Sequence, residues 1–368
     1  MKAYIVEIEA LAAIVEAVQT LAGSSVIWGV LKGNGYGIGL LPLARILRER
    51  GVTHFAVTEL REAERLREEF PDAPILMLRA VTDPAELGAL LDLDVILAVG
   101  TTRTALLLDT LAAERGVTAK VHLCFDTGMG RYGFLPGETE SALVVFGLEH
   151  LAVCGTFTHF HSAFCSEKAT RRQFALFTEI LERIRAAGFD PGMAHCCNSS
   201  ALFKYPQMKL DAVRVGSAFL GRLAFRTSPA LRKVGFAECC VEELRVLPKG
   251  QTVGYAAGWK AKEPTRVAVI GLGWYHGFTA ERQNDLFRAR DSLRAVAHHL
   301  KDLFFRRNII VEVNGHKCRV LGHVGMVHAV VDVTGVECAL GDRVTAQVNP
   351  LNVKGLRIHY RSSQEATT

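Results

Sequence analysis

The chain has 368 residues, 49% of them hydrophobic, and a formal net charge of +5. This length suffices for two domains, or for one barrel with an appended domain. The mild charge forms no dense basic stripe with interleaved aromatic residues, so we expect no nucleic-acid partner. The absence of an apolar run of about 18 residues and of a signal peptide predicts a cytoplasmic protein that does not bind a membrane.

The first predicted strand spans 26–31 and leads into the motif Lys32-Gly-Asn-Gly-Tyr36. Lysine at the carboxyl end of a buried strand is costly unless its charge is used or removed. A desolvated amine with a lowered pKa suits Schiff-base formation, and bare amides of the adjacent glycines suit a phosphate, which Tyr36 would also reach. The alternative is a solvent-exposed lysine that follows a strand.

Strand-like and helix-like segments alternate from residue 26 to residue 222. Eight units of this size predict a (β/α)8 TIM-type barrel over 8–232, and the count favours the barrel over a doubly wound sheet. The strands are expected at 26–32, 54–59, 74–79, 95–99, 120–126, 152–159, 193–198 and 213–220. Helical spacing is clearest at 41–49, 61–69, 102–115 and 169–187.

Polar residues cluster at the carboxyl ends of the predicted barrel strands, where barrel enzymes keep their chemistry. Gly216 and Ser217 are expected on the eighth strand itself, and the others follow their strands. The clustered residues are Lys32, Asp126, Arg131, His159, Asn198, Ser199, Gly216 and Ser217. One end of one barrel would therefore collect them all.

After about residue 235 the pattern changes to strand-like alternation, which predicts a C-terminal all-β domain over 233–368, with residues 1–7 added. Its strands are expected at 241–247, 266–272, 309–313, 317–320, 329–333 and 343–348. A basic amphipathic helix near 281–307 interrupts them, either as a solvated helix or as a surface for anions, a membrane or a partner. His316 and Cys318 lack a second ligand pair, so we predict no metal site.

Nine cysteines, an odd number, do not indicate a disulfide scaffold. Cys124 and Cys154 lie inside apolar strand-like runs. Buried free thiols in a reducing compartment are the better interpretation.

The chain resembles the alanine racemase family, pyridoxal-phosphate enzymes with a (β/α)8 barrel and a C-terminal β-domain. The resemblance is carried by Lys32-Gly-Asn-Gly-Tyr36-Gly, by Asp126-Thr-Gly-Met-Gly-Arg131-Tyr-Gly, and by Asn198-Ser199-Ser200 followed by Val213-Arg214-Val215-Gly216. It implies that Lys32 binds pyridoxal 5'-phosphate as a Schiff base and that Arg131 binds the substrate carboxylate. The phosphate would be held by Tyr36, Asn198, Ser199, Gly216, Ser217 and, near the end of the chain, Tyr360.

The same resemblance places Arg214 opposite the pyridine nitrogen. Arginine does not give up its proton in proteins, so it would leave that nitrogen unprotonated. The ring would then withdraw electrons less strongly, which favours simple proton exchange at Cα. The alternative for Arg214 is a surface salt bridge.

Racemisation needs a proton donor and acceptor on each face of the carbanion, and Lys32 would be one of them. In the family, the second proton donor and acceptor is a tyrosine of the second domain, contributed by the partner subunit. Trp274 occupies that position here. Tyr275 could be displaced into the role, although strand alternation would turn it away. His276 could replace it, or the second base is missing. His159 would either support this second proton transfer or simply pack in the barrel.

Two further departures concern substrate binding. Cys124 stands where many relatives carry a carbamylated lysine. Met326, in a turn that resembles the family's, would still offer its backbone amide to the substrate carboxylate, but the following aspartate is replaced by Val327. Trp274 would also shape the substrate pocket.

The predicted function is a pyridoxal-phosphate-dependent racemase for alanine or another small amino acid, acting as a homodimer with shared active sites. A second hypothesis keeps the cofactor but replaces racemisation by decarboxylation, aldol cleavage or another lyase reaction, because the second base is missing. A third is a cofactor-binding protein without turnover, although such proteins of this fold usually lack the β-domain.

Overall fold

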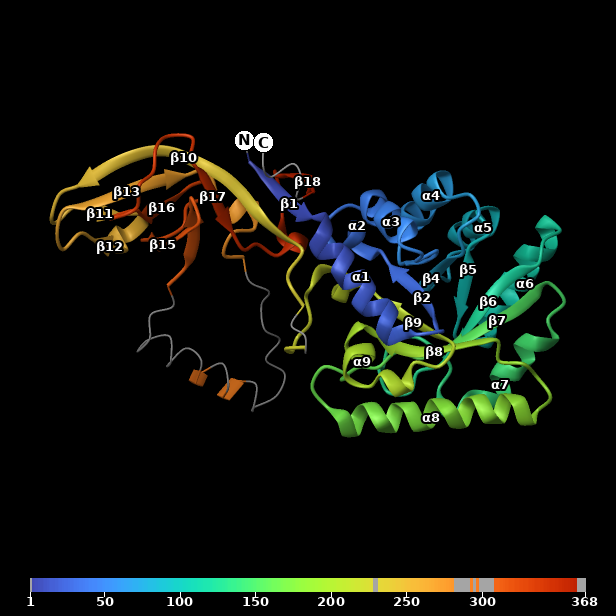
Figure 1. Cartoon of the computed structure of the whole chain (residues 1–368). Helices are drawn as coiled ribbons and strands as arrows, with labels where there is room; N and C mark the ends of the chain where they lie inside the picture. Colours follow the sequence, from blue (N-terminus) through green and yellow to red (C-terminus); the bar gives the residue numbers. More distant parts are fainter. Residues whose placement is uncertain (1, 228–230, 281–291, 294–295, 298–307, 363–368) are drawn as a thin grey trace. The chain divides into compact units, whose positions relative to one another are not determined.

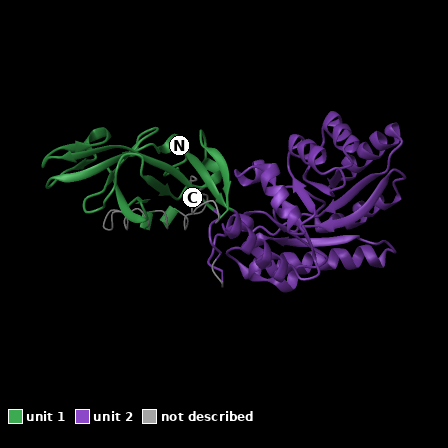
Figure 2. Ribbon diagram, turned by 45° about the horizontal axis from the view of Figure 1, so that its top comes forward, with its two compact units in different colours: residues 1–7, 235–368 green, residues 8–234 purple. Residues whose placement is uncertain are grey.

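The computed structural model describes residues 2–227, 231–280, 292–293, 296–297 and 308–362 (Figure 1). They form two compact units, one of residues 8–234 and one that joins residues 1–7 to residues 235–368 (Figure 2). The helix expected at 281–307 lies outside the described residues except for 292–293 and 296–297. Among the described residues, no helix combines the length and the apolar content that a membrane crossing requires.

The larger unit is a closed barrel of parallel strands, as predicted, and the doubly wound alternative is wrong because the first and last strands pair. The strands are β2 Val26–Val30, β3 His54–Val57, β4 Ile75–Ala80, β5 Ile96–Val99, β6 Ala119–Cys124, β7 Leu151–Phe157, β8 Met193–Asn198 and β9 Ala212–Val215. Most of their residues are buried, as expected for strands covered on both faces.

Helices surround the barrel in the connections between its strands (Figure 1). In α3, the buried residues Leu40, Leu43, Ala44 and Leu47 repeat at helical spacing and face the core. The helices are α1 Ile8–Ala22, α3 Leu40–Glu49, α4 Leu60–Glu69, α5 Pro84–Asp92, α6 Thr102–Arg115, α7 Thr139–Leu143, α8 Glu167–Ala186 and α9 Ser199–Lys204. Side-chain caps fix several starts, such as Asp83 on α5 and Ser166 on α8.

The smaller unit is all-β in its described part, as predicted. Its main sheet has the order β13-β16-β15-β14-β17-β10-β1-β18, in which only β1 and β18 pair in parallel. The strands are β1 Ala3–Glu7, β10 Gly235–Leu247, β13 Thr265–Ile270, β14 Ile310–Val313, β15 His316–Leu321, β16 Ala329–Asp332, β17 Arg343–Ala346 and β18 Arg357–Arg361. A separate two-stranded ribbon joins β11 Thr252–Val253 to β12 Trp259–Lys260.

Two expectations about strands are corrected. β2 ends at Val30, so Lys32 belongs to a tight turn and not to the strand. β9 ends at Val215, and Ser217 opens a short 3-10 helix, so neither Gly216 nor Ser217 lies on the eighth strand.

Candidate active site

A left-handed turn holds Lys32 at the carboxyl end of β2. The segment α2, Lys32–Tyr36, has positive φ angles of 65° at Gly33, 54° at Asn34, 64° at Gly35 and 54° at Tyr36. Left-handed backbone is strained for residues with a Cβ, so the two glycines lower the cost of this turn. Two of the glycine amides expected to be bare are in fact used, because Gly35 N–H donates to the Leu31 carbonyl (2.7 Å) and Gly37 N–H donates to the Gly33 carbonyl (3.0 Å). The amide of Asn34 between them donates to Glu62 Oε1 (3.1 Å).

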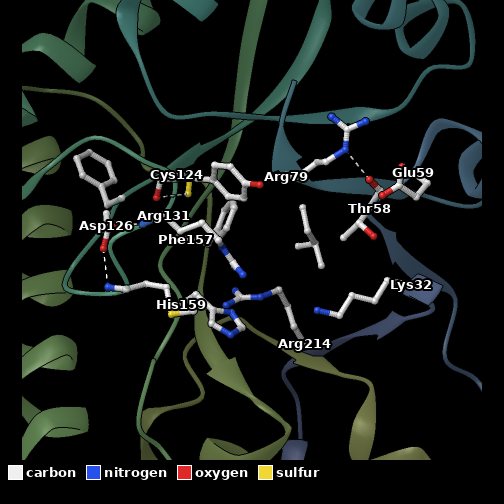
Figure 3. Close-up of a pocket in the computed structure, with 14 residues that line it drawn as sticks. Lys32, Thr58, Glu59, Arg79, Cys124, Asp126, Arg131, Phe157, His159 and Arg214 are labelled. Carbon is white, nitrogen blue, oxygen red and sulfur yellow. Dashed lines mark hydrogen bonds between the residues drawn. The ribbon is translucent and has the colours of Figure 1, made fainter. Parts of the chain in front are cut away.

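The turn directs the Lys32 amine toward Arg214 and His159 (Figure 3). Burial lowers the pKa of Lys32, and the positive charges of Arg131 and Arg214 lower it further, while the Glu62 carboxylate opposes them. The predicted desolvated amine is therefore present. A lysine in this state spends more time as the neutral nucleophile than an exposed lysine does.

A cavity of about 180 Å³ adjoins the Lys32 amine on one side. It is lined by Lys32, Tyr36, His159, Asn198, Ser199, Ser200, Arg214, Gly216 and Ser217, among others. A side chain at position 216 would collide with the phenol of Tyr36, so Gly216 is what allows that ring to enter the cavity. Hydroxyls, an amide and an amine line this space, so the residues present fit a phosphorylated aldehyde such as pyridoxal phosphate.

Two of the predicted phosphate ligands are already hydrogen-bonded to each other. Ser199 Oγ accepts from Gly216 N–H (3.0 Å) and from Ala218 N–H (3.3 Å). Asn198 caps α9 through its Oδ1, which accepts from Ala201 N–H (3.0 Å). The structure thus brings together all of the barrel residues predicted to hold the cofactor, with Ser199 linking the loops after β8 and β9.

Arg214 on β9 is buried inside the barrel, so the surface salt bridge considered for it is wrong. Its guanidinium donates to the carbonyls of Thr158 (2.6 Å) and His195 (3.0 Å) and to His195 Nδ1. Because arginine only donates, His195 must carry its proton on Nε2 and donate to His122 Nδ1, 2.8 Å away. Burial lowers the pKa of Arg214 to about 10, which still leaves a cation near neutral pH.

His159 follows β7 and lines the cavities on both sides of Lys32. Burial, followed by the positive charges of Arg214, Arg131 and Lys32, lowers the pKa of His159 to about 3. Within the described part of the chain its ring has no hydrogen-bond partner. It is therefore a neutral imidazole at the mouth of the barrel and not a residue packed solely into the core.

A second cavity, of about 220 Å³, lies on the other side of Lys32 and includes Asp126 and Arg131 (Figure 3). The Asp126 carboxylate accepts from the backbone amides of Gly128, Met129 and Arg131 at 2.6–2.8 Å. Burial alone would raise the pKa of Asp126, but these amides and that of Gly130 lower it overall. Asp126 thus shapes its own loop.

The guanidinium of Arg131 has no carboxylate partner among the described residues and lies over the ring of Tyr132, 5.2 Å from its centroid. Cys124 is a buried thiol whose pKa burial raises to about 12, and its Sγ donates to the Tyr132 carbonyl (3.6 Å). No anion on Cys124 therefore competes for Arg131, whose charge is available to a ligand carboxylate.

The residues predicted for the second proton exchange lie in the β-domain, on a 3-10 turn, Trp274–His276. Strand alternation does not apply to such a turn, so it gives no reason to place Tyr275 on the opposite side from Trp274. Trp274 is 53% exposed and Tyr275 is 41% exposed. His276 is only 4% exposed, and its Nδ1 accepts from Gly273 N–H (3.1 Å).

The same face of the β-domain contains the predicted carboxylate-binding turn. Trp274 N–H donates to the Gly325 carbonyl (3.1 Å) and Tyr275 N–H donates to the Met326 carbonyl (2.9 Å). Among the described residues, the amide of Met326 itself has no acceptor. Tyr360 lies on β18, where burial raises its pKa.

Sequence reasoning missed three residues that support the site: Glu62, His195 and His122. Glu62 could have been noticed as a carboxylate on the buried side of α4, beside Ala63 and Leu66. His195 and His122 lie in apolar strands and give no such signal, because only barrel closure brings β6, β8 and β9 together.

A closed parallel barrel with an appended β-domain, and a desolvated lysine among cations and hydroxyls at the carboxyl ends of its strands, define a lysine-centred barrel enzyme. The profile of the alanine racemase N-terminal domain matches residues 6–223, and that of the alanine racemase C-terminal domain matches residues 237–354. The chain belongs to the alanine racemase family.

Individual relatives agree with this assignment. The chain is 32% identical to an alanine racemase of Desulforamulus reducens over 83% of this chain and 78% of that protein. It is 30% identical to the alanine racemase of Desulfosudis oleivorans over 92% of this chain and 85% of that protein.

Solved structures share the fold. The alanine racemase of Clostridium difficile 630 has a TM-score of 0.83 at 21% identity, over 98% of this chain and 96% of that one. The alanine racemase of the D-cycloserine producer Streptomyces lavendulae has a TM-score of 0.82 at 22% identity, over 99% of this chain and 98% of that one.

Proposed function

We propose that the pocket around Lys32 is the catalytic site of a pyridoxal-phosphate-dependent racemase that acts on alanine or another small amino acid. The chain is an isomerase of the amino-acid racemase class, and its family depends on pyridoxal phosphate. The observation that carries the proposal is the desolvated Lys32 amine, which lies between a hydroxyl-lined cavity and a cavity that contains the Arg131 guanidinium.

Apart from Tyr360 of the β-domain, the residues that would hold the cofactor line one cavity of the barrel. Lys32 would bind its aldehyde, Arg214 would meet its ring nitrogen, and the phosphate would lie among Tyr36, Asn198, Ser199, Gly216 and Ser217, with Tyr360 as a further contact. When bound, pyridoxal phosphate provides an electron sink for the electron pair left at Cα when its proton leaves.

Different residues of the chain then transfer the proton and bind the substrate. Lys32 takes a proton from one face of Cα and returns it, which a buried amine with a lowered pKa can do. Arg131 and the backbone amide of Met326 would hold the substrate carboxylate. Arg214 keeps its own protons, so it transfers none to the ring nitrogen.

We assign proton exchange on the opposite face to Tyr275 of a partner subunit in a homodimer. Its ring is exposed on the turn that also carries Trp274, whereas His276 lies behind it at a ring-centroid distance of 5.5 Å and is buried. His276 and His159 therefore act as supporting groups in this scheme, and Trp274 limits the size of the substrate side chain.

Two measurements test the proposed function. Borohydride reduction of the cofactor-loaded protein should leave the cofactor covalently attached to Lys32, and Lys32→Ala should abolish the cofactor absorbance. Incubation of each alanine enantiomer in deuterated water should place deuterium at Cα in both enantiomers of the product. An adduct on another residue would contradict the cofactor site, and retained configuration with new products would indicate a lyase instead.

A further inference from the structure

Glu62 is a buried carboxylate in the first turn of α4, with only 8% of its surface exposed. Its two oxygens accept from two different segments: Oε1 from Asn34 N–H (3.1 Å) and Oε2 from Thr58 N–H (3.2 Å). Asn34 lies within the left-handed turn that begins at Lys32, and Thr58 follows β3. One side chain thus ties the lysine turn to the neighbouring barrel strand.

The charge of this carboxylate matters for Lys32. Burial and the guanidiniums of Arg131 and Arg214 all favour the neutral amine, and His159 is itself neutral. Among the described groups that act on Lys32, Glu62 alone raises its pKa. An amine that must both accept and return a proton benefits from such a counter-charge, because without it the protonated form would be less populated.

Glu62 also acts on the phenol of Tyr36, which lines the cavity that contains Ser199 and Gly216. Burial, followed by the charge of Glu62, raises the pKa of Tyr36 to about 12, so that Tyr36 remains a hydroxyl donor near neutral pH. A phenol that keeps its proton can donate a hydrogen bond to an anion. The same carboxylate therefore favours the protonated form of both side chains.

A chain of contacts continues from Glu62 into the other cavity. The Thr58 carbonyl accepts from Arg79 Nε (2.6 Å), and Arg79 forms an ion pair with Glu86. Thr58, Arg79 and Lys32 all line the cavity that contains Asp126 and Arg131 (Figure 3). Glu62 is thus placed to hold a wall of this cavity and the lysine turn in one arrangement.

We propose that Glu62 is a positioning residue of the racemase: it fixes the left-handed turn that presents Lys32 and supplies the negative charge that stabilises the protonated amine. The inference rests on the proposed function, because that function gives Lys32 its two proton-transfer duties. Glu62 itself need not touch the substrate or the cofactor.

The test is the pH dependence of Lys32 acetylation by acetic anhydride in the full cofactor-free chain, read residue by residue by mass spectrometry. Only the neutral amine reacts, so the midpoint of the curve reports the proton affinity of Lys32. In Glu62→Gln we expect this midpoint to fall, because the opposing charge is lost. Glu64→Gln is the matched control, since Glu64 is an exposed carboxylate on the same helix.

An equal Lys32 midpoint in Glu62→Gln and Glu64→Gln would overturn the proposal, whereas a purely structural role would change the melting temperature of Glu62→Gln without moving the midpoint. If Glu62→Gln does not fold, Glu62→Asp tests the anchoring role instead. The shorter carboxylate keeps its charge but cannot span both amides, so hydrogen exchange at Asn34 should accelerate about tenfold. Unchanged exchange would contradict the anchoring role.

These measurements need no cofactor, so they separate this inference from the proposed function. A cofactor adduct found on a residue other than Lys32 would reject the proposed function and leave the link between Glu62 and Lys32 intact. An adduct on Lys32 combined with an unmoved midpoint would reject the role of Glu62 alone.

Discussion

Lys32 and the residues around it show how single side chains set the chemistry of this site. Burial and two arginines favour the neutral amine, and one buried glutamate opposes them. The motif around Lys32 predicts the desolvated amine, because a buried apolar strand carries the lysine that follows it toward the protein interior. It does not predict the counter-charge, because Glu62 is distant in sequence and reaches the turn only through the fold.

Trp274 stands where the family carries a tyrosine, and this difference leads to a testable prediction. Trp274→Tyr should raise the racemisation rate at least about tenfold, because it adds a phenol where the family carries its second acid–base group. The rate is measured by chiral chromatography with both alanine enantiomers. Trp274→Phe is the control, since it changes the size of the ring without adding a hydroxyl. An equal gain in both variants would show that Trp274 acts by bulk, and a loss in both would show that the indole has a role of its own.

The turn that carries Lys32 is the element whose conformation the sequence least reveals. The glycines at 33 and 35 suggest bare amides, whereas the structure shows that they permit four successive residues with positive φ. Strands and helices are predicted better because burial repeats at fixed intervals along them. Tight turns have no such period, so the predicted end of β2, before the left-handed turn, and that of β9, before a short 3-10 helix, are both too late.

The strain in this turn can be measured. Gly35→Ala should lower the free energy of unfolding by about 1 kcal/mol, because a Cβ at φ 64° is strained and would lie 3.3 Å from the Leu40 nitrogen. Denaturant unfolding of the full chain measures the difference. Gly137→Ala serves as the control, since a Cβ there meets nothing within 4 Å. A similar loss in both variants would refute the idea that Gly35 relieves backbone strain.

The whole molecule combines a barrel that holds Lys32 with a β-domain that carries Tyr275. The proposed sharing of active sites between subunits predicts complementation between two inactive variants. Lys32→Ala and Tyr275→Phe each lack one group, and a heterodimer of the two has one doubly defective site and one intact site. Co-refolding equal amounts should restore roughly a quarter of the wild-type activity if subunits pair at random. Activity no higher than that of the two variants measured separately would contradict shared sites.

The sequence alone determined the class of fold and most of the barrel site. The repeated strand and helix periods required a layered arrangement of parallel strands, and polar residues at the carboxyl ends of those strands then had to meet. For that reason Lys32, Arg131, His159 and Ser199 can be identified without coordinates, whereas Arg214 was identified from the resemblance to the family.

Only the tertiary structure decided the hydrogen-bond partners and the neighbouring charges of each of these groups. The partners of Arg214, the amides around Asp126, the position of the Arg131 guanidinium over Tyr132 and the carboxylate behind Lys32 all depend on how the chain folds around them. Periodicity reports which face of an element is buried, whereas hydrogen bonds and local charges depend on which other element faces it. That second kind of information arises when the barrel closes.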